Sequence, residues 1–211
     1  MTPPTVDAYY DPQANTINFP AGILQPPFFF KDGDDAVNYG AIGLVIGHEI
    51  THGFDDEGRQ YDADGNLKDW WTKDDEAKFK TKADLVVAQY NGYVAVDTFH
   101  INGRLTLGEN IADIGGEAIA YAAFKKTAQG KGTEKISGLT ADQRYFMSLA
   151  QVWRSKVRDE VFRTQVMNDP HSTAMFRVLG PASNTPGFYE AYGLKPGDKM
   201  YRDDSIRVHI W

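Results

Sequence analysis

The 211-residue sequence contains no cysteine, which excludes disulfide bonds, thiolate catalysis and every metal site that needs a cysteine ligand. Its lysines and arginines are scattered and total 22 against 29 aspartates and glutamates, so no basic stripe suggests a nucleic-acid partner. The longest apolar run ends at His48 and is too short to cross a bilayer. Residues 1–4 show no charged and apolar leader, so no signal peptide is visible. These absences leave the compartment open and are typical of one acidic globular domain, which we expect over residues 1–211.

The sequence is organised around His48-Glu49-Ile50-Thr51-His52, which reads H-E-x-x-H. On a helix, histidines four residues apart lie on one face and can bind a single metal ion. Glu49 can then approach the open side of that metal and take a proton from a water molecule there. This pattern predicts the centre of a zinc peptidase, with His48 and His52 as ligands and Glu49 as the general base.

The alternative interpretation is a surface helix that carries two solvated histidines. The preceding residues 39–47 are almost wholly apolar and small, and a helix that is apolar on all sides is a buried helix. Two histidines and a carboxylate on such a helix need a partner, because unsatisfied buried polar groups are costly. The flanking sequence therefore favours a metal site.

The rest of the chain predicts a mainly helical domain with a short hairpin. Strands are expected over residues 5–10 and 16–19, and helices over residues 36–54, 73–91, 108–127, 140–157 and 158–166, with short helices near Thr173 and Gly187. Residues 98–107 are expected to form a loop or a short strand, and residues 129–132 a flexible break. Residues 62–66 faintly resemble a calcium loop, but they lack the spacing and the closing glutamate of an EF-hand, which favours an ordinary turn.

Catalytic zinc usually has three protein ligands, so the two histidines need a third. Glu109 is the best candidate, since it begins a helix whose small residues would allow close packing against the metal helix. Asp113 lies four residues later on the same face and could accept the free ring N–H of a metal-binding histidine. The alternative for Glu109 is a carboxylate stabilised by the helix dipole, and the spacing to Asp113 favours the ligand.

Two segments together, His48–Asp56 and Gly108–Asp113, resemble the neprilysin and endothelin-converting-enzyme family of zinc peptidases. The likeness extends over nearly the whole sequence. The further similar segments are Ala8–Tyr10, Phe19–Phe29, Gln151–Trp153, His171–Ser172, Phe176–Arg177 and the last residue, Trp211.

The resemblance implies a role for each candidate site residue. His48, His52 and Glu109 would bind zinc, Glu49 would be the general base, and Asp113 would orient a histidine ligand. His171 would stabilise the oxyanion of the tetrahedral intermediate, and Arg177 would hold a backbone carbonyl of the substrate. The apolar pocket for the residue after the scissile bond would be lined by Phe28, Val45, Val152 and Trp153. Asp7 and Ala8 would belong to the strand that grips the substrate backbone.

The sequence departs from the family in two respects. The family has asparagine where this chain has Asp7, and an ionised aspartate only accepts hydrogen bonds, whereas asparagine also donates. Family members are also much longer, with a large N-terminal helical half that covers the active site. We therefore expect an open catalytic face, which would bind such an N-terminal half or a second copy of the chain.

These observations predict an α+β, mainly α-helical fold: a thermolysin-like zinc peptidase catalytic domain with a small sheet beside the zinc helix. The expected function is hydrolysis of oligopeptides by a zinc endopeptidase that holds one Zn²⁺ and prefers an apolar residue after the scissile bond. The alternative is a catalytically silent fragment, or a partner-binding half whose site needs a second chain. A purely structural zinc site is disfavoured, because such sites are usually closed by four protein ligands.

Overall fold

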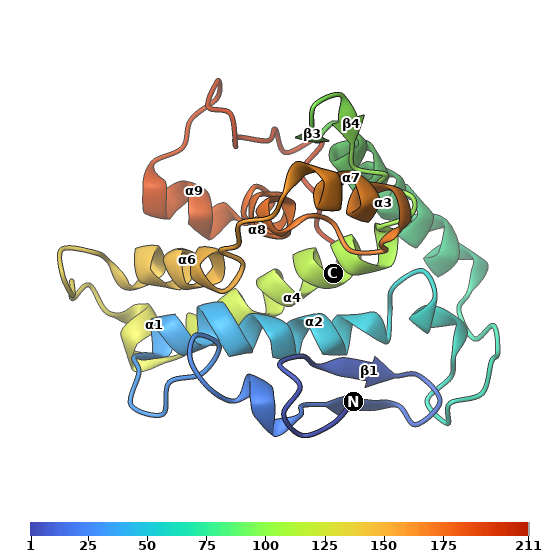
Figure 1. The fold of residues 1–211 in the computed structure, drawn as a ribbon, viewed down its shortest axis with the longest axis horizontal. Helices are drawn as coiled ribbons and strands as arrows, with labels where there is room; N and C mark the ends of the chain where they lie inside the picture. Colours follow the sequence, from blue (N-terminus) through green and yellow to red (C-terminus); the bar gives the residue numbers. More distant parts are fainter. Residues whose placement is uncertain (211) are drawn as a thin grey trace.

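The computed structural model describes residues 1–210, and Trp211, the last residue of the family resemblance, lies outside this range. The fold is mainly α-helical, and two neighbouring helices, α2 and α4, run through its middle (Figure 1). The N-terminal hairpin lies along one side of α2, while α6, α8 and α9 lie on the other side of the α2–α4 pair (Figure 1). No helix within residues 1–210 has both the length and the apolar character needed to cross a membrane.

The helices agree with most of the sequence expectations. They are α1 (Asp35–Asn38), α2 (Leu44–His52), α3 (Lys73–Asn91), α4 (Leu107–Phe124), α5 (Ala128–Lys131), α6 (Ala141–Val152), α7 (Asp159–Asn168), α8 (Ala174–Ala182) and α9 (Pro186–Tyr192). Two expectations were wrong. The helix expected over 140–157 ends at Val152, and the expected break at 129–132 overlaps the short helix α5, which the Thr127 side chain caps by accepting the Gly130 N–H.

Two small antiparallel sheets complete the fold. Strand β1 (Tyr9–Asp11) pairs with β2 (Thr16–Asn18), and β3 (Val94–Val96) pairs with β4 (Phe99–His100). The expected N-terminal hairpin is confirmed, but its first strand starts later than residue 5. The reason is a different partner for the preceding segment, in which the Pro3 carbonyl accepts a hydrogen bond from the Gly22 N–H at 2.8 Å.

The metal-binding helix predicted over 36–54 is one continuous helical segment in the structure. It begins with α1, widens into a π-helical turn at Tyr39–Gly43 and continues as α2. Asp34 caps its start, because its side chain accepts a hydrogen bond from the Val37 N–H at 2.8 Å. The π-helical turn has no counterpart in the sequence pattern.

Helices α2 and α4 touch at their backbones, and this contact places the candidate site. A Cβ atom on Gly47 would lie 2.6 Å from the carbonyl oxygen of Gly116, and one on Gly116 would lie 2.5 Å from the backbone nitrogen of His48. A side chain at either position would therefore push the helices apart. The close approach brings the first turns of α4 against the histidine face of α2.

Apolar clusters fix this helix pair on both sides. One cluster packs α3, α8 and the C-terminal tail on α4 through Val86, Tyr90, Ile111 and other buried side chains. A second cluster packs α6 on the opposite end of α4 through Phe124, Tyr145 and other aromatic residues. The two ligand-bearing helices are thus held in place by apolar packing as well as by their backbone contact.

Candidate metal centre and active site

His48 and His52 lie one turn apart on α2, and their side chains converge. Their Nε2 atoms are 2.9 Å apart, and the two rings stand perpendicular to each other, with centroids 4.5 Å apart. His48 is buried and His52 is partly buried. The i, i+4 spacing in the sequence has therefore brought two imidazole nitrogens to one point.

A carboxylate holds the other nitrogen of each ring. The His48 Nδ1 atom lies 2.8 Å from the Asp113 carboxylate, and the His52 Nδ1 atom lies 2.7 Å from the Asp55 carboxylate. Because a carboxylate accepts, each Nδ1 donates its proton to a carboxylate, which leaves Nε2 as the metal-binding atom of each ring. Two lone pairs at 2.9 Å repel unless a cation lies between them, so the donor set fits a metal ion.

Glu109 adds a carboxylate to this point from the first turn of α4. Its oxygens lie 3.3 Å from His48 Nε2 and 3.6 Å from His52 Nε2. Two imidazole nitrogens and one carboxylate, with space left for water or substrate, are a donor set that catalytic zinc sites use.

Glu49 is a second carboxylate beside the histidine pair, since ligand atoms of His48, Glu49 and His52 lie within 4.8 Å of one another. The pKa values separate the two glutamates. Burial works against the charge of Glu109, but the His48 hydrogen bond and neighbouring positive charges lower its pKa to about 2. Burial raises the pKa of Glu49, and Glu109 and Asp7 add to this effect while the histidines oppose it. A permanently ionised group suits a ligand, and a raised pKa suits a base.

The carboxylates around His48 stabilise positive charge at its ring. Burial alone would lower the pKa of His48, but its hydrogen bonds to Asp113 and Glu109 raise it to about 9. A proton on the ring and a metal ion at Nε2 are two cations that this environment stabilises, and they compete for one lone pair.

Arg177 of α8 joins the site from the side opposite α2. Its guanidinium donates to both Asp113 oxygens, at 2.7 and 2.8 Å, and lies over the Trp153 ring, 4.1 Å from the ring centroid. Burial would raise the pKa of Asp113, because it favours the neutral acid, yet the charge of Arg177 and the hydrogen bonds from Arg177 and His48 hold that pKa well below its usual range. Asp113 therefore stays ionised and orients His48 and Arg177 together.

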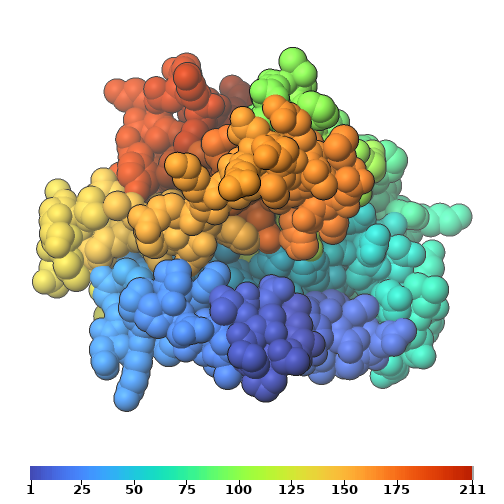
Figure 2. All heavy atoms as spheres, in the orientation of Figure 1, coloured from blue at the N-terminus to red at the C-terminus, as the bar shows by residue number. Residues whose placement is uncertain are grey.

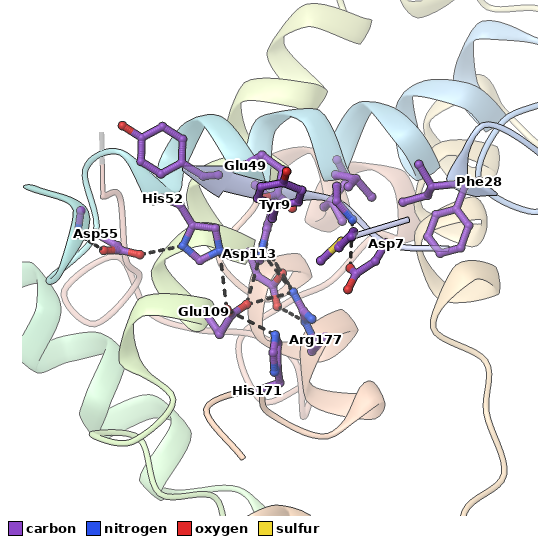
Figure 3. A pocket seen from close by; sticks show the side chains of 18 of the residues that line it. Asp7, Tyr9, Phe28, Glu49, His52, Asp55, Glu109, Asp113, His171 and Arg177 are labelled. Atoms are coloured by element: carbon purple, nitrogen blue, oxygen red, sulfur yellow. Dashed lines mark hydrogen bonds and ion pairs between the residues drawn. The ribbon is translucent and has the colours of Figure 1, made fainter. Parts of the chain in front are cut away.

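His171 lies at the edge of the site, with its side chain about half exposed. Its Nε2 atom is 3.3 Å from Glu109, and its Nδ1 atom is 2.7 Å from Asp169. The ring therefore points one nitrogen toward the metal-binding carboxylate (Figure 3).

All these groups line one cavity of about 610 Å³. It opens between the N-terminal segment and the segment that leads from α6 to α8 (Figure 2). Asp7, Ala8, Phe28, Val45 and Trp153, which the sequence predicts as substrate-binding residues, also line it. Val152 does not line this cavity. It lies in an adjoining hollow together with Trp153, His171 and Arg177, because α6 ends there and turns neighbouring side chains to different sides.

The sequence reasoning missed the two aspartates that hold histidine rings, Asp55 and Asp169. Each lies two or three residues from its histidine, in D-x-H and H-x-x-D spacing, which is a local signal that could have identified both. It also missed Tyr9, Tyr10 and Glu57, which line the cavity but carry no motif.

Comparisons with known proteins agree with this geometry. The model of peptidase family M13 matches residues 7–208. Endothelin-converting enzyme 1 of Rattus norvegicus is 47% identical over 214 residues, which cover 100% of this chain and 28% of the relative. Neprilysin-3 of Drosophila melanogaster is 47% identical over 215 residues, which cover 100% of this chain and 27% of the relative. The chain thus spans little more than a quarter of the length of these curated relatives.

Solved structures show the same likeness in three dimensions. The inhibitor complex of Mycobacterium tuberculosis zinc metalloprotease ZMP1 superposes with a TM-score of 0.95 at 48% identity, over 100% of this chain and 33% of that one. The crystal structure of PEPO from Lactobacillus rhamnosis gives a TM-score of 0.87 at 38% identity, over 96% of this chain and 31% of that one. From its sequence and its fold, the chain belongs to peptidase family M13.

Proposed function

We propose that this chain is the catalytic portion of a zinc endopeptidase that hydrolyses peptide bonds in oligopeptides. The observation that carries the proposal is the meeting of His48 Nε2, His52 Nε2 and the Glu109 carboxylate inside an open cavity. Membership of peptidase family M13 and the likeness to a zinc metalloprotease support it.

His48, His52 and Glu109 would hold one Zn²⁺, with Asp113 and Asp55 orienting the two rings. When bound, zinc would supply Lewis acidity, which lowers the pKa of water and polarises a carbonyl group. Three protein ligands leave room for substrate, as a catalytic site requires and a structural site does not.

Glu49 would take the proton from the attacking water. It is 5% exposed, lies next to His48 on α2 and has a raised pKa, so its affinity for a proton exceeds that of an ordinary carboxylate. A general base works best when its pKa approaches the working pH.

His171 and Arg177 would act on the substrate carbonyl groups. The exposed His171 ring faces the metal-binding carboxylate and could donate to an oxyanion that develops there. Arg177 would hold a substrate backbone carbonyl while Asp113 and the Trp153 ring keep its guanidinium in place.

The apolar lining of the cavity suggests that the substrate residue after the scissile bond is apolar. Phe28 and Val45 are half-buried and lie together on one side of Glu49, and Trp153 closes the cavity from the opposite segment. An apolar side chain seated there would bury surface that now meets water. Val152 would contribute only through its neighbour Trp153. Ala8, just before β1, would offer its backbone to the peptide.

We also propose that residues 1–211 form one catalytic domain whose open face meets another part of a larger assembly. The relatives are several times longer than this chain, and the cavity here is open to solvent. The partner would be an N-terminal half or a second copy. The competing proposal is that the chain is silent until such a partner completes the site.

Metal analysis combined with a fluorogenic-peptide assay, before and after chelation, tests these proposals. Stoichiometric zinc with chelation-sensitive turnover supports an enzyme that is active alone. Zinc without turnover supports the need for a second chain, and light scattering would then show whether the chain self-associates. Absence of zinc binding would contradict both.

A further inference from the structure

Asp7 places an unneutralised carboxylate in the wall of the cavity. It lies just before β1, between Glu49 and Phe28 in the close view (Figure 3). Its Oδ1 atom accepts a hydrogen bond from the Ala8 N–H at 2.9 Å, which fixes the side chain at the cavity wall. The residue is exposed, and within residues 1–210 no lysine, arginine or histidine forms an ion pair with it.

The side-chain cations that line the cavity all pair with other carboxylates. Arg177 is held by Asp113 and Glu109. The histidine pairs are His48 with Asp113 and Glu109, His52 with Asp55 and Glu109, and His171 with Asp169 and Glu109. No side-chain cation of the cavity is therefore paired with Asp7, and a basic group of a bound peptide could take that place.

Asp7 also borders the apolar part of the cavity. Phe28 and Val45 pack against Ala8, the neighbour of Asp7, so a peptide whose apolar side chain lay there would run close to the Asp7 carboxylate. In an extended peptide the next side chains follow at about 3.3 Å per residue, within reach of a lysine or arginine stem.

We propose that Asp7 is a specificity-determining residue that selects peptides with a lysine or arginine one or two residues from the apolar side chain seated against Phe28 and Val45. This rests on the proposed peptidase function and names its substrate class. A carboxylate attracts the basic side chain and repels an acidic one at the same place, and the low-dielectric walls of a cavity strengthen both effects.

The test uses three fluorogenic peptides that differ at one position beside the apolar residue, with lysine, glutamine or glutamate there. We expect the wild-type chain to favour the lysine peptide over the glutamate peptide by about tenfold in kcat/KM, as attraction and repulsion of an exposed pair add. Asp7→Asn should bring this ratio close to one, and Asp7→Glu should keep most of it. Added salt should shrink the wild-type ratio.

Two control variants separate a local effect from a general one. Asp64→Asn removes the same charge from an exposed turn outside the cavity. Glu57→Gln removes a charge from a cavity-lining residue whose backbone N–H donates to Asp55. Asp55 lies at the end of the cavity away from Asp7 (Figure 3). Both should leave the lysine-to-glutamate ratio unchanged. A fall in the ratio for Glu57→Gln as large as for Asp7→Asn would overturn the assignment to Asp7.

A binding measurement keeps the inference separate from the proposed function. Affinities of the three peptides for the Glu49→Gln chain, read from tryptophan fluorescence, need no turnover. Equal affinities for the lysine and glutamate peptides would overturn the role of Asp7. If wild-type chain cleaves all three peptides at one rate, the specificity inference fails and the peptidase function stands. If the wild-type chain cleaves none of the peptides but the Glu49→Gln chain binds the lysine peptide preferentially, the peptidase function fails and the specificity inference stands.

Discussion

Glu117 is a buried carboxyl group whose replacement should change how the stability of the chain depends on pH. Glu117 lies on α4, one turn beyond Asp113, and is fully buried. Its Oε2 atom accepts a long hydrogen bond of 3.4 Å from the Tyr145 hydroxyl, and its Oε1 atom has no hydrogen-bond partner within residues 1–210. Burial, with a contribution from Asp113, raises its pKa from 4.5 to about 8 against the opposing Tyr145 bond. The side chain is therefore a neutral acid at pH 7.

The sign of the pH dependence follows from this raised pKa. Between pH 4.5 and about 8 the folded chain keeps a proton that the unfolded chain has lost. The free energy of unfolding must therefore fall as pH rises through this window, by up to about 1.4 kcal/mol per pH unit from this group. Glu117→Gln has the same shape and does not titrate. Its stability relative to wild type should rise by about 2 kcal/mol between pH 6 and pH 8.

Urea unfolding at pH 6, 7 and 8, with all chains in the same metal buffer, measures this difference. Glu117→Leu should show the same relative rise and also gain stability at pH 6, because it removes an unsatisfied buried oxygen. Glu134→Gln, on the exposed loop before α6, is the matched control and should follow wild type. Parallel pH curves for wild type and Glu117→Gln would refute the reasoning.

Three further predictions concern the site. His171→Ala should lower kcat by about a hundredfold, since an oxyanion donor acts in the transition state, and a change in KM alone would assign His171 to ground-state binding. Asp55→Asn should weaken zinc binding by about 10- to 100-fold in a competition titration, because it disturbs the His52 ring, and an unchanged affinity would count against that role. Asp7→Asn should bind an uncharged peptide-like inhibitor more tightly, by about 1 kcal/mol, through a regained N–H donor, and equal affinity would place Asp7 outside the binding site.

Side chains a few residues apart in the sequence account for where helices begin and for which residues share a helix face. Thr72 and Thr140 cap α3 and α6 with side chains that accept the N–H three residues later. The i, i+4 spacing of the histidines and of Glu109 and Asp113 predicted which side chains share a helix face. The structure brings these two faces together.

What the sequence left open depends on tertiary contacts. The π-helical turn before α2 and the backbone contact of Gly47 with Gly116 arise where two helices meet, and no periodicity encodes them. Val152 is the last residue of α6. It lies in the adjoining hollow and not in the cavity, because the helix ends there. The D-x-H spacing to Asp169 is a local signal at His171, but it assigns no catalytic role, so only the family resemblance pointed to one.

The pairing of zinc content with peptide turnover in wild type and Glu49→Gln tests the central proposal most directly. The account predicts that both chains hold one zinc, because Glu49 is not a ligand, and that only wild type cleaves the peptide. His52→Ala is the matched control and should lose the metal itself. Near-normal turnover by the Glu49→Gln chain, with its zinc in place, would contradict the account.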